Sequence, residues 1–395
     1  MSSRNTPRTL VILGAGVGGV PLAHHVLRFT APKVPNLRVI LVSPNTHFYW
    51  NLASPRAILS EEFSDKLFLP LAPAFAQYGD KFELVHGVAS SLDPDRNAVV
   101  VSLADGGTRE IAYDAVVVAT GSSDAQGLPW KGLGSTVATQ QALQDLRRQI
   151  DGARTIVVAG AGATGVEIVG ELAVFSAAGA KDVVLVIPDA LPLAPPAKPG
   201  VRDAVRAELE KRKVRIVPNT RITAATATTT PAGSTTTLEL TAKDGATQTL
   251  VADVYLPAFG VRPNTAFAPP RLLGASGQFK QTRRLRAEGY ENVFVIGDAG
   301  DIEETRALFT DNQMNYVARA LQVFLAGGAD EAAEYKPADR YMLGVSIGKE
   351  GGTGQAMGFK IPNWVIWYLK SRTLGTDYTP DIVAGQRTIV GKMKA

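Results

Sequence analysis

The 395-residue chain contains no cysteine. Disulfides, thiolate metal sites, cysteine nucleophiles and redox cysteine pairs are therefore all excluded. The histidines are also few, His24, His25, His47 and His86, and their spacing matches no metal site. We predict a protein without a bound metal.

Long apolar runs and a strong net charge are lacking too. No stretch approaches the ~20 apolar residues that span a bilayer, and "MSSRNTPRTLVIL" enters a strand with no apolar signal region. The formal charge is only +4, which argues against a nucleic-acid partner. Position 2 is serine rather than glycine, which excludes N-myristoylation. We expect a cytoplasmic protein, monomeric or homodimeric.

Glycine is abundant, and it recurs twice in the spacing G-x-G-x-x-G after an apolar run and before a helix. In such turns the first glycine permits a tight bend, the second lets the backbone approach a pyrophosphate, and the third packs helix on strand. The pyrophosphate then lies on the N-terminus of the helix. The candidates for cofactor binding are Gly14, Gly16, Gly18 and Gly19 in the first turn, and Gly160, Gly162, Thr164 and Gly165 in the second.

Each glycine turn opens a βαβ pattern, which predicts an α/β protein with two parallel sheets. In the first unit we expect strands at 10–13, 37–43, 82–88, 98–103, 114–122 and 292–301, with helices at 17–29 and 311–325. In the second we expect strands at 154–159, 182–187 and 254–264, helices at 163–178 and 201–213, and an exposed hairpin formed by the threonine-rich stretch 223–237 and the residues after it.

The acidic residue that usually binds the adenosine ribose at the end of the second strand is missing from both units. Ser43 stands there in the first unit and can still bond a ribose hydroxyl, whereas Ile187 in the second offers nothing polar. No basic residue follows Ile187 until Lys198 and Arg202. We therefore expect the second site to accept both NADH and NADPH.

Two further motifs, "VVVATGS" ending at Ser122 and "NVFVIGDAGD" containing Gly297 and Asp298, resemble those of the two-dinucleotide flavin oxidoreductases. The resemblance implies that the first turn binds FAD and the second NAD(P)H. It makes Asp298 a ligand of the FAD ribityl chain and places Thr120 and Gly121 near the pyrophosphate. Gly297 joins the FAD-site candidates, and Gly260 joins those of the NAD(P)H site.

"FYWNLASPRA", "GATGVEIVGEL", "VIGDAGD" and the tail "YMLGVSIGKEGGTGQAMGFKIPNWVIWYLKSR" resemble the AMID-like flavoproteins, relatives of apoptosis-inducing factor and type II NADH dehydrogenases. The resemblance implies a glutathione reductase-like fold, with two Rossmann-like domains and a small α+β C-terminal domain. We expect an FAD domain at 1–122 and 266–328, an NAD(P)H domain at 123–265 and an interface domain at 329–395. The implied activity is oxidation of NAD(P)H through FAD with reduction of a quinone-like acceptor.

The same resemblance implies roles for three residues. Glu167 would lie beside the nicotinamide, the alternative being a carboxylate on a helix surface. Arg56 would lie near the flavin or the acceptor and stabilise anionic reduced flavin, the alternative being a salt bridge. Gln313 would present polar groups to the flavin.

"WVIWYLK" at 364–370 places Trp364, Trp367 and Tyr368 at helical spacing. Core or dimer packing explains that spacing, and peripheral membrane contact is the alternative. Two other functions stay open for the whole chain: a flavoenzyme specific for one metabolite, and a flavin-bound effector of the apoptosis-inducing-factor type with little turnover.

Overall fold

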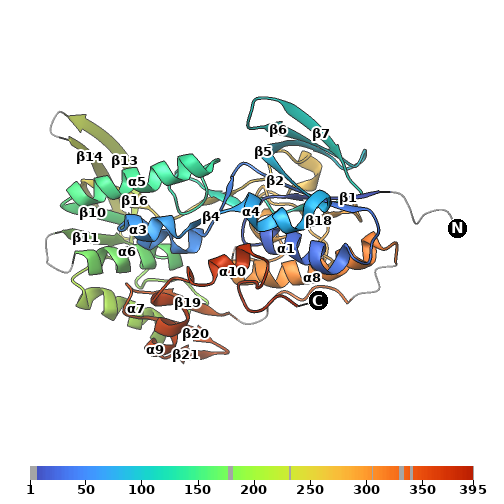
Figure 1. Ribbon diagram of the computed structural model, residues 1–395. Helices are drawn as coiled ribbons and strands as arrows, with labels where there is room; N and C mark the ends of the chain where they lie inside the picture. Colours follow the sequence, from blue (N-terminus) through green and yellow to red (C-terminus); the bar gives the residue numbers. More distant parts are fainter. Residues whose placement is uncertain are drawn as a thin grey trace.

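The computed structural model describes residues 7–176, 181–230, 233–304, 306–328, 333–338 and 341–394. Two Rossmann-like sheets lie side by side, and a smaller C-terminal unit lies against both of them (Figure 1). The predicted α/β class is confirmed.

The first sheet has the strand order β18-β8-β1-β2-β5-β6-β7. Its parallel part is built from short runs of Val, Ile and Leu that are buried on both faces, as is usual for parallel sheets. From Gly87 onward β5 pairs antiparallel with β6, so this end of the sheet is a meander. The strands are β1 (Arg8–Leu13), β2 (Leu37–Ser43), β5 (Phe82–Asp93), β6 (Ala98–Leu103), β7 (Thr108–Ala112), β8 (Ala115–Val118) and β18 (Val293–Val295).

One face of this sheet is covered by α1 (Gly19–His25) and α8 (Ala307–Leu325). The predicted helix at 17–29 is confirmed, although it turns π-helical at Val26–Thr30. Shorter elements fill the stretch between β2 and β5. They are β3 (His47–Tyr49), α2 (Ser54–Ala57), α3 (Glu61–Asp65), β4 (Phe68–Pro70) and α4 (Leu71–Phe75).

The second sheet has the order β12-β11-β10-β16, all parallel. Its strands are β10 (Thr155–Ala159), β11 (Asp182–Val186), β12 (Arg215–Val217) and β16 (Val254–Pro257), and its helices are α5 (Thr136–Gly152), α6 (Ala163–Phe175) and α7 (Pro199–Lys211). The helix predicted for 163–178 matches α6, and residues 177 and 178 lie outside the described part.

The threonine-rich stretch forms a larger sheet than the predicted hairpin. β13 (Thr220–Thr230) and β14 (Gly233–Ala242) pair as expected, and β15 (Thr247–Ala252) adds a third antiparallel strand. This small sheet packs Leu238 and Leu240 against the outer face of the second parallel sheet.

Three strands were predicted too long. The stretch 292–301 forms a strand only at Val293–Val295 and turns at Gly297, whose φ is +70°. The stretch 114–122 breaks after β8, and 254–264 breaks after β16, because Gly121 and Gly260 adopt left-handed backbone angles, with φ of +65° and +80°. After these breaks the chain forms β9 (Ser122–Asp124) and β17 (Val261–Pro263), which pair with each other. This two-stranded ribbon carries the chain between the two sheets.

The C-terminal unit contains the meander β19 (Leu343–Ser346), β20 (Gly352–Ala356) and β21 (Phe359–Ile361). Next come α9 (Asn363–Ile366), a π-helical turn at Trp367–Ser371, and α10 (Thr379–Val383). In Figure 1 this unit lies beneath the junction of the two sheets. None of the helices in the described ranges is long and apolar enough to cross a membrane.

Candidate active site

The first glycine turn follows β1 at the carboxyl edge of its sheet. Gly14 has a φ of +108°, and a Cβ on Gly19 would collide with the carbonyl oxygen of Gly14, so only glycine fits either position. A Cβ on Gly18 would press against Thr310 and Ile296, which makes Gly18 a packing residue between α1 and its neighbours. A Cβ on Gly16 would meet nothing within 4 Å. The open backbone at Gly16 fits a pyrophosphate at the N-terminus of α1.

The turns after β8 and β18 lie beside this glycine turn, because β18, β8 and β1 are adjacent parallel strands. Gly297 has a φ of +70°, which turns the chain toward Asp298. The Asp298 carboxylate accepts hydrogen bonds from Ser122 Oγ at 2.6 Å and Lys131 Nζ at 2.8 Å. Sequence reasoning missed Lys131, which has no recognisable motif around it.

Thr120 leaves a polar atom free at the same edge. Its Oγ1 is buried and has no hydrogen-bond partner within the described residues. An unsatisfied buried hydroxyl costs free energy, so it points to a group that completes the site. Together with the open backbone at Gly16, it fits a bound FAD.

Gln313 lies on α8 behind the Gly-Asp turn and is buried. Its Oε1 accepts a hydrogen bond from the Gly297 N–H at 2.7 Å, and its Nε2 donates to Glu303 at 2.8 Å. The amide oxygen thus holds the turn, and the amide nitrogen is engaged by Glu303.

Ser43, at the end of β2, is buried, and its hydroxyl both donates to the Asn45 carbonyl and accepts from the Asn45 N–H, each at 3.0 Å. The hydroxyl therefore stabilises its own turn. A serine oxygen has two lone pairs, so it can still accept one further hydrogen bond.

The second glycine turn repeats the first. Gly160 has a φ of +96°, and a Cβ on Gly165 would collide with the carbonyl oxygen of Gly160. A Cβ on Gly162 would meet nothing within 4 Å, and Thr164 lies half-buried in the first turn of α6. Gly260 follows the adjacent strand β16 at the same edge. This turn fits a second dinucleotide.

Ile187 is buried, as its apolar character suggests, but Asp189 lies two residues further on. Asp189 is half-exposed, and its Oδ1 lies 3.6 Å from Lys243 Nζ. Its position after β11, next to the strand of the glycine turn, is where a ribose acceptor belongs. The residue was overlooked because it does not directly end the strand.

Glu167 faces the C-terminal unit from the second turn of α6 and is buried. Its Oε1 lies 2.5 Å from Lys370 Nζ and accepts a hydrogen bond from the Ser346 N–H at 3.2 Å. Lys370 Nζ also donates to the Gly344 carbonyl at 2.9 Å. The structure thus pairs the predicted Glu167 with a lysine that sequence reasoning did not single out.

Arg56, on α2, makes a buried salt bridge to Glu171, one helical turn beyond Glu167 on α6. Its Nε and one Nη donate to the two carboxylate oxygens at 3.0 Å and 2.7 Å. The guanidinium also donates to the carbonyls of Ser371 and Arg372, at 2.7 Å and 3.1 Å. Burial raises the pKa of Glu171 even though the Arg56 guanidinium opposes that rise. Arg56 therefore joins α2, α6 and the C-terminal unit.

No cluster of three or more metal-ligating side chains occurs in the described parts of the chain. His24 is a core residue: its ring stacks on Phe75 and bonds to Tyr78 and the Val383 carbonyl. Burial lowers the pKa of His24 to about 4, so it is neutral at physiological pH.

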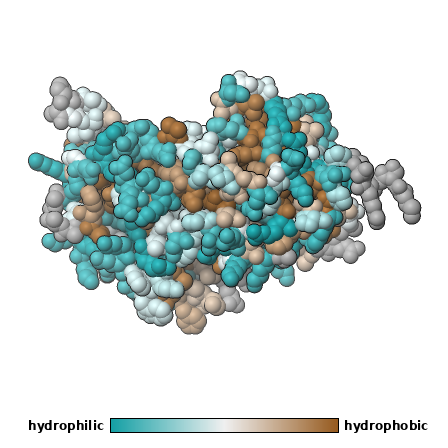
Figure 2. Space-filling model, viewed as in Figure 1, coloured by the Kyte–Doolittle hydropathy of each residue, from teal (hydrophilic) through white to brown (hydrophobic). Residues whose placement is uncertain are grey.

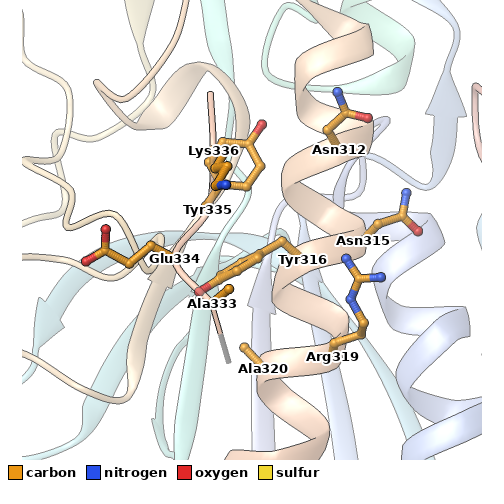
Figure 3. A pocket seen from close by; sticks show the side chains of 9 residues that line it. All are labelled: Asn312, Asn315, Tyr316, Arg319, Ala320, Ala333, Glu334, Tyr335 and Lys336. Atoms are coloured by element: carbon orange, nitrogen blue, oxygen red, sulfur yellow. The ribbon is translucent and has the colours of Figure 1, made fainter. Parts of the chain in front are cut away.

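A hollow of about 560 Å³ lies on the outer face of α8 (Figure 3). Tyr316 and Tyr335 meet across it at 5.6 Å between ring centroids. No predicted site residue lines the hollow. Gln313 lies on the same helix but bonds to the Gly-Asp turn. Its lining residues are Asn312, Asn315, Tyr316, Arg319, Ala320, Ala333, Glu334, Tyr335 and Lys336.

The family model described as pyridine nucleotide-disulphide oxidoreductase matches residues 8–321. The chain belongs to this family. FAD and NAD(P)H are the cofactors of the family, in agreement with those that the resemblance implied.

Relatives with similar sequences match nearly the whole chain. It is 37% identical to the oxidoreductase ptaL of Pestalotiopsis fici, covering 95% of this chain and 98% of that protein. It is 24% identical to the ferroptosis suppressor protein 1 of Homo sapiens, covering 92% and 93%. The predicted likeness to AMID-like flavoproteins is confirmed.

Among solved structures, the sulfide:quinone oxidoreductase of Aquifex aeolicus superposes with a TM-score of 0.75, covering 96% of this chain and 92% of that chain. The sequence identity is 17%, so this likeness concerns the fold alone.

Proposed function

We propose that the protein oxidises NAD(P)H and passes two electrons through FAD to a quinone-like or other small acceptor. The observation that carries the proposal is the absence of cysteine from a chain that has both dinucleotide turns. With no thiol to relay electrons, an acceptor from solution or from a membrane must reach the flavin itself. FAD, when bound, supplies the two-electron chemistry, and the protein supplies position and charge.

The residues around the first turn would hold the FAD. The amides near Gly16 and the N-terminus of α1 would bind its pyrophosphate. Asp298, already oriented by Ser122 and Lys131, would accept hydrogen bonds from ribityl hydroxyls. Gln313 would keep Asp298 in place by holding the Gly297 turn.

We assign the action on the reactants to Glu167 and Lys370, because Glu167 lies on α6 directly after the second glycine turn and Lys370 is paired with it. Both hydrogen bonds to Glu167 end on Oε1, so Oε2 would be available to orient the nicotinamide carboxamide. The Lys370 ammonium, paired with Glu167, would stabilise, and protonate, an acceptor oxygen as it gains negative charge. Reduction of a quinone to a hydroquinone needs one such proton beside each hydride equivalent.

A second candidate is an oxidoreductase acting on one particular metabolite. The identity to oxidoreductase ptaL, 37%, exceeds the 24% identity to the ferroptosis suppressor protein 1 of Homo sapiens.

The absence of disulfide chemistry supports the cytoplasm as the proposed compartment for either activity.

The test compares acceptors and variants. Reduced enzyme is mixed with a panel of soluble quinones, with oxygen and with candidate metabolites, for wild type, Glu167→Gln and Lys370→Met. We expect quinones to reoxidise the flavin fastest, Lys370→Met to slow that step by about 100-fold, and Glu167→Gln to slow reduction by NADH. One metabolite turning over far faster than every quinone would establish the second candidate. Unchanged rates in both variants would remove the roles given to these residues.

A further inference from the structure

The loop after β11 and the turn between β14 and β15 meet beside the second glycine turn. The Asn219 N–H donates to the Asp189 carbonyl at 3.0 Å, and the Lys243 N–H donates to the Asn219 carbonyl at 2.8 Å. Further along the same loop, the Leu193 N–H donates at 2.8 Å to the carbonyl of Ala161, which lies inside the glycine turn. These backbone hydrogen bonds hold Asp189 and Lys243 at the carboxyl edge of the second sheet, next to the dinucleotide site.

Asp189 and Lys243 face each other across this junction. Asp189 Oδ1 lies 3.6 Å from Lys243 Nζ, which is longer than a hydrogen bond, and the side chains are 48% and 62% exposed. An ion pair so open to water is weak, so a negatively charged ligand can draw the ammonium away from Asp189. The carboxylate of the neighbouring Asp244 bends back into its own turn, where Oδ1 accepts the Ala246 N–H at 3.0 Å. Lys243 therefore offers a positive charge to a ligand at this edge.

The first two basic residues that follow β11 in the chain are held by other contacts. The Arg202 guanidinium donates to the carbonyls of Pro192 and Leu191, at 3.1 Å and 2.9 Å, and so holds the loop itself. The Lys198 ammonium lies against the C-terminal unit, since a Cβ on Gly358 would be 3.7 Å from Lys198 Nζ. The positive charge at this corner of the site is therefore supplied by the β14–β15 turn, far along the chain from β11.

From these observations we propose that Lys243 binds the 2′-phosphate of NADPH, while Asp189 accepts hydrogen bonds from the ribose hydroxyls of NADH. The adenosine ribose of a dinucleotide lies at the end of the strand that follows the glycine turn and its helix, which here is β11. The 2′ and 3′ positions of the ribose are on adjacent carbons, so a carboxylate and an ammonium side by side suit both nucleotides. With NADPH, Asp189 keeps the 3′-hydroxyl and Lys243 pairs with the phosphate, which lysine binds as a point charge.

Recognition of NADPH by Lys243 rests on the proposed function in one respect, namely that the second glycine turn holds NAD(P)H. The surface of the unit that carries this turn is mostly hydrophilic over α5 in the view of Figure 2. A phosphate bound to an exposed lysine on such a unit stays in contact with water, so dissolved ions screen the interaction. Binding of NADPH should therefore weaken with rising salt more steeply than binding of NADH.

The test measures binding of NAD+ and NADP+ to the full-length, oxidised, FAD-loaded protein by isothermal titration calorimetry. We expect the wild type to bind both nucleotides. Lys243→Met should raise the Kd for NADP+ by about tenfold or more, because a charge-assisted contact is lost, and should leave the Kd for NAD+ within about twofold. Lys243→Arg should retain NADP+ binding. Asp189→Asn should raise the Kd for NAD+ more than the Kd for NADP+.

The matched control is Lys211→Met, which removes an exposed lysine from the last residue of α7. Because α7 ends shortly before β12 begins, Lys211 lies at the edge of the sheet opposite the glycine turn, and this variant should bind both nucleotides as the wild type does.

A pair of fragments, 2′,5′-ADP and ADP, isolates the contribution of the 2′-phosphate. The wild type should prefer 2′,5′-ADP, and both Lys243→Met and high salt should abolish that preference. A wild type that does not bind NADP+, an unchanged Kd for NADP+ in Lys243→Met, or equal weakening of both nucleotides by that variant would each overturn the proposal. Binding of NADP+ that depends on Lys243, without reduction of any quinone, would contradict the proposed function and leave the assignment of Lys243 intact.

Discussion

At the scale of single residues, Arg56 and Glu171 form a buried polar contact between the two halves of the molecule. The side chains are 11% and 6% exposed, and the guanidinium meets both carboxylate oxygens. The guanidinium also donates hydrogen bonds to the carbonyls of Ser371 and Arg372, the two residues that follow Lys370. A bidentate pair in such a setting is rigid. Arg56 therefore fixes the segment that carries Lys370 and keeps Lys370 close to Glu167.

The first prediction concerns this pair. Arg56→Met should lower the free energy of unfolding by about 3–5 kcal/mol, because it leaves the Glu171 carboxylate buried without a partner. Arg56→Met/Glu171→Leu should recover most of the loss, since neither charge is then buried. Urea unfolding followed by tryptophan fluorescence measures both. A stable Arg56→Met that only slows flavin reduction would place the guanidinium at the flavin instead.

The position of a candidate site residue could be predicted from sequence only where a motif fixes the backbone. Asp298 follows a buried strand and a glycine with positive φ, and both are visible in "VFVIGDAG". Lys131 and Lys370 lie in loops or short helices far along the chain from the carboxylates they meet. No local pattern encodes such long-range pairings, because they depend on how whole units pack.

At the scale of elements, the two glycine turns have the same internal geometry. In each turn the first glycine has a positive φ, and a Cβ on the third glycine would collide with the carbonyl oxygen of the first. A Cβ on the second glycine would meet nothing within 4 Å. A substitution of the second glycine can therefore test ligand binding without disturbing the fold. Alanine at that position fits the protein but occupies space that a phosphate needs.

The second prediction uses such a substitution. Gly16→Ala should weaken FAD binding by about 2 kcal/mol or more, roughly thirtyfold, without loss of folding. Gly162→Ala should retain FAD and instead raise the KM for NADH. Flavin absorbance per chain and steady-state kinetics measure the two effects. Gly200→Ala, on α7 with equally open surroundings, is the matched control and should change neither. Loss of flavin from the Gly162 variant, or none from the Gly16 variant, would contradict the assignment of the two turns.

Element positions could be predicted well where apolar periodicity is strong. The strand at 37–43 and the strand at 98–103 agree with β2 and β6 in both bounds. The errors came at Gly121, Gly260 and Gly297, where the predicted strand continues but the backbone turns. The third strand β15 was missed because "TQTLVA" is short and begins with three polar residues, so it lacks a clear apolar–polar alternation.

At the scale of the whole molecule, three units meet around α6. The helix begins at the second glycine turn, presents Glu167 to the C-terminal unit, and presents Glu171 to Arg56 of the first unit. Electron transfer requires that the two dinucleotides be held in a fixed relation, and these buried charge pairs supply that fixation. In the proposed function, an external acceptor receives the electrons, because the chain has no cysteine to take them.

The central claim is that NAD(P)H electrons pass through the flavin to a quinone-like acceptor, and an anaerobic titration tests it most directly. Purified protein is reduced with NADH or NADPH while the flavin absorbance is followed, and a soluble quinone is then added. We predict that the nucleotide bleaches the flavin and that one equivalent of quinone restores it as hydroquinone appears. A flavin that stays oxidised with both nucleotides, or stays reduced in the presence of every quinone, would contradict the claim.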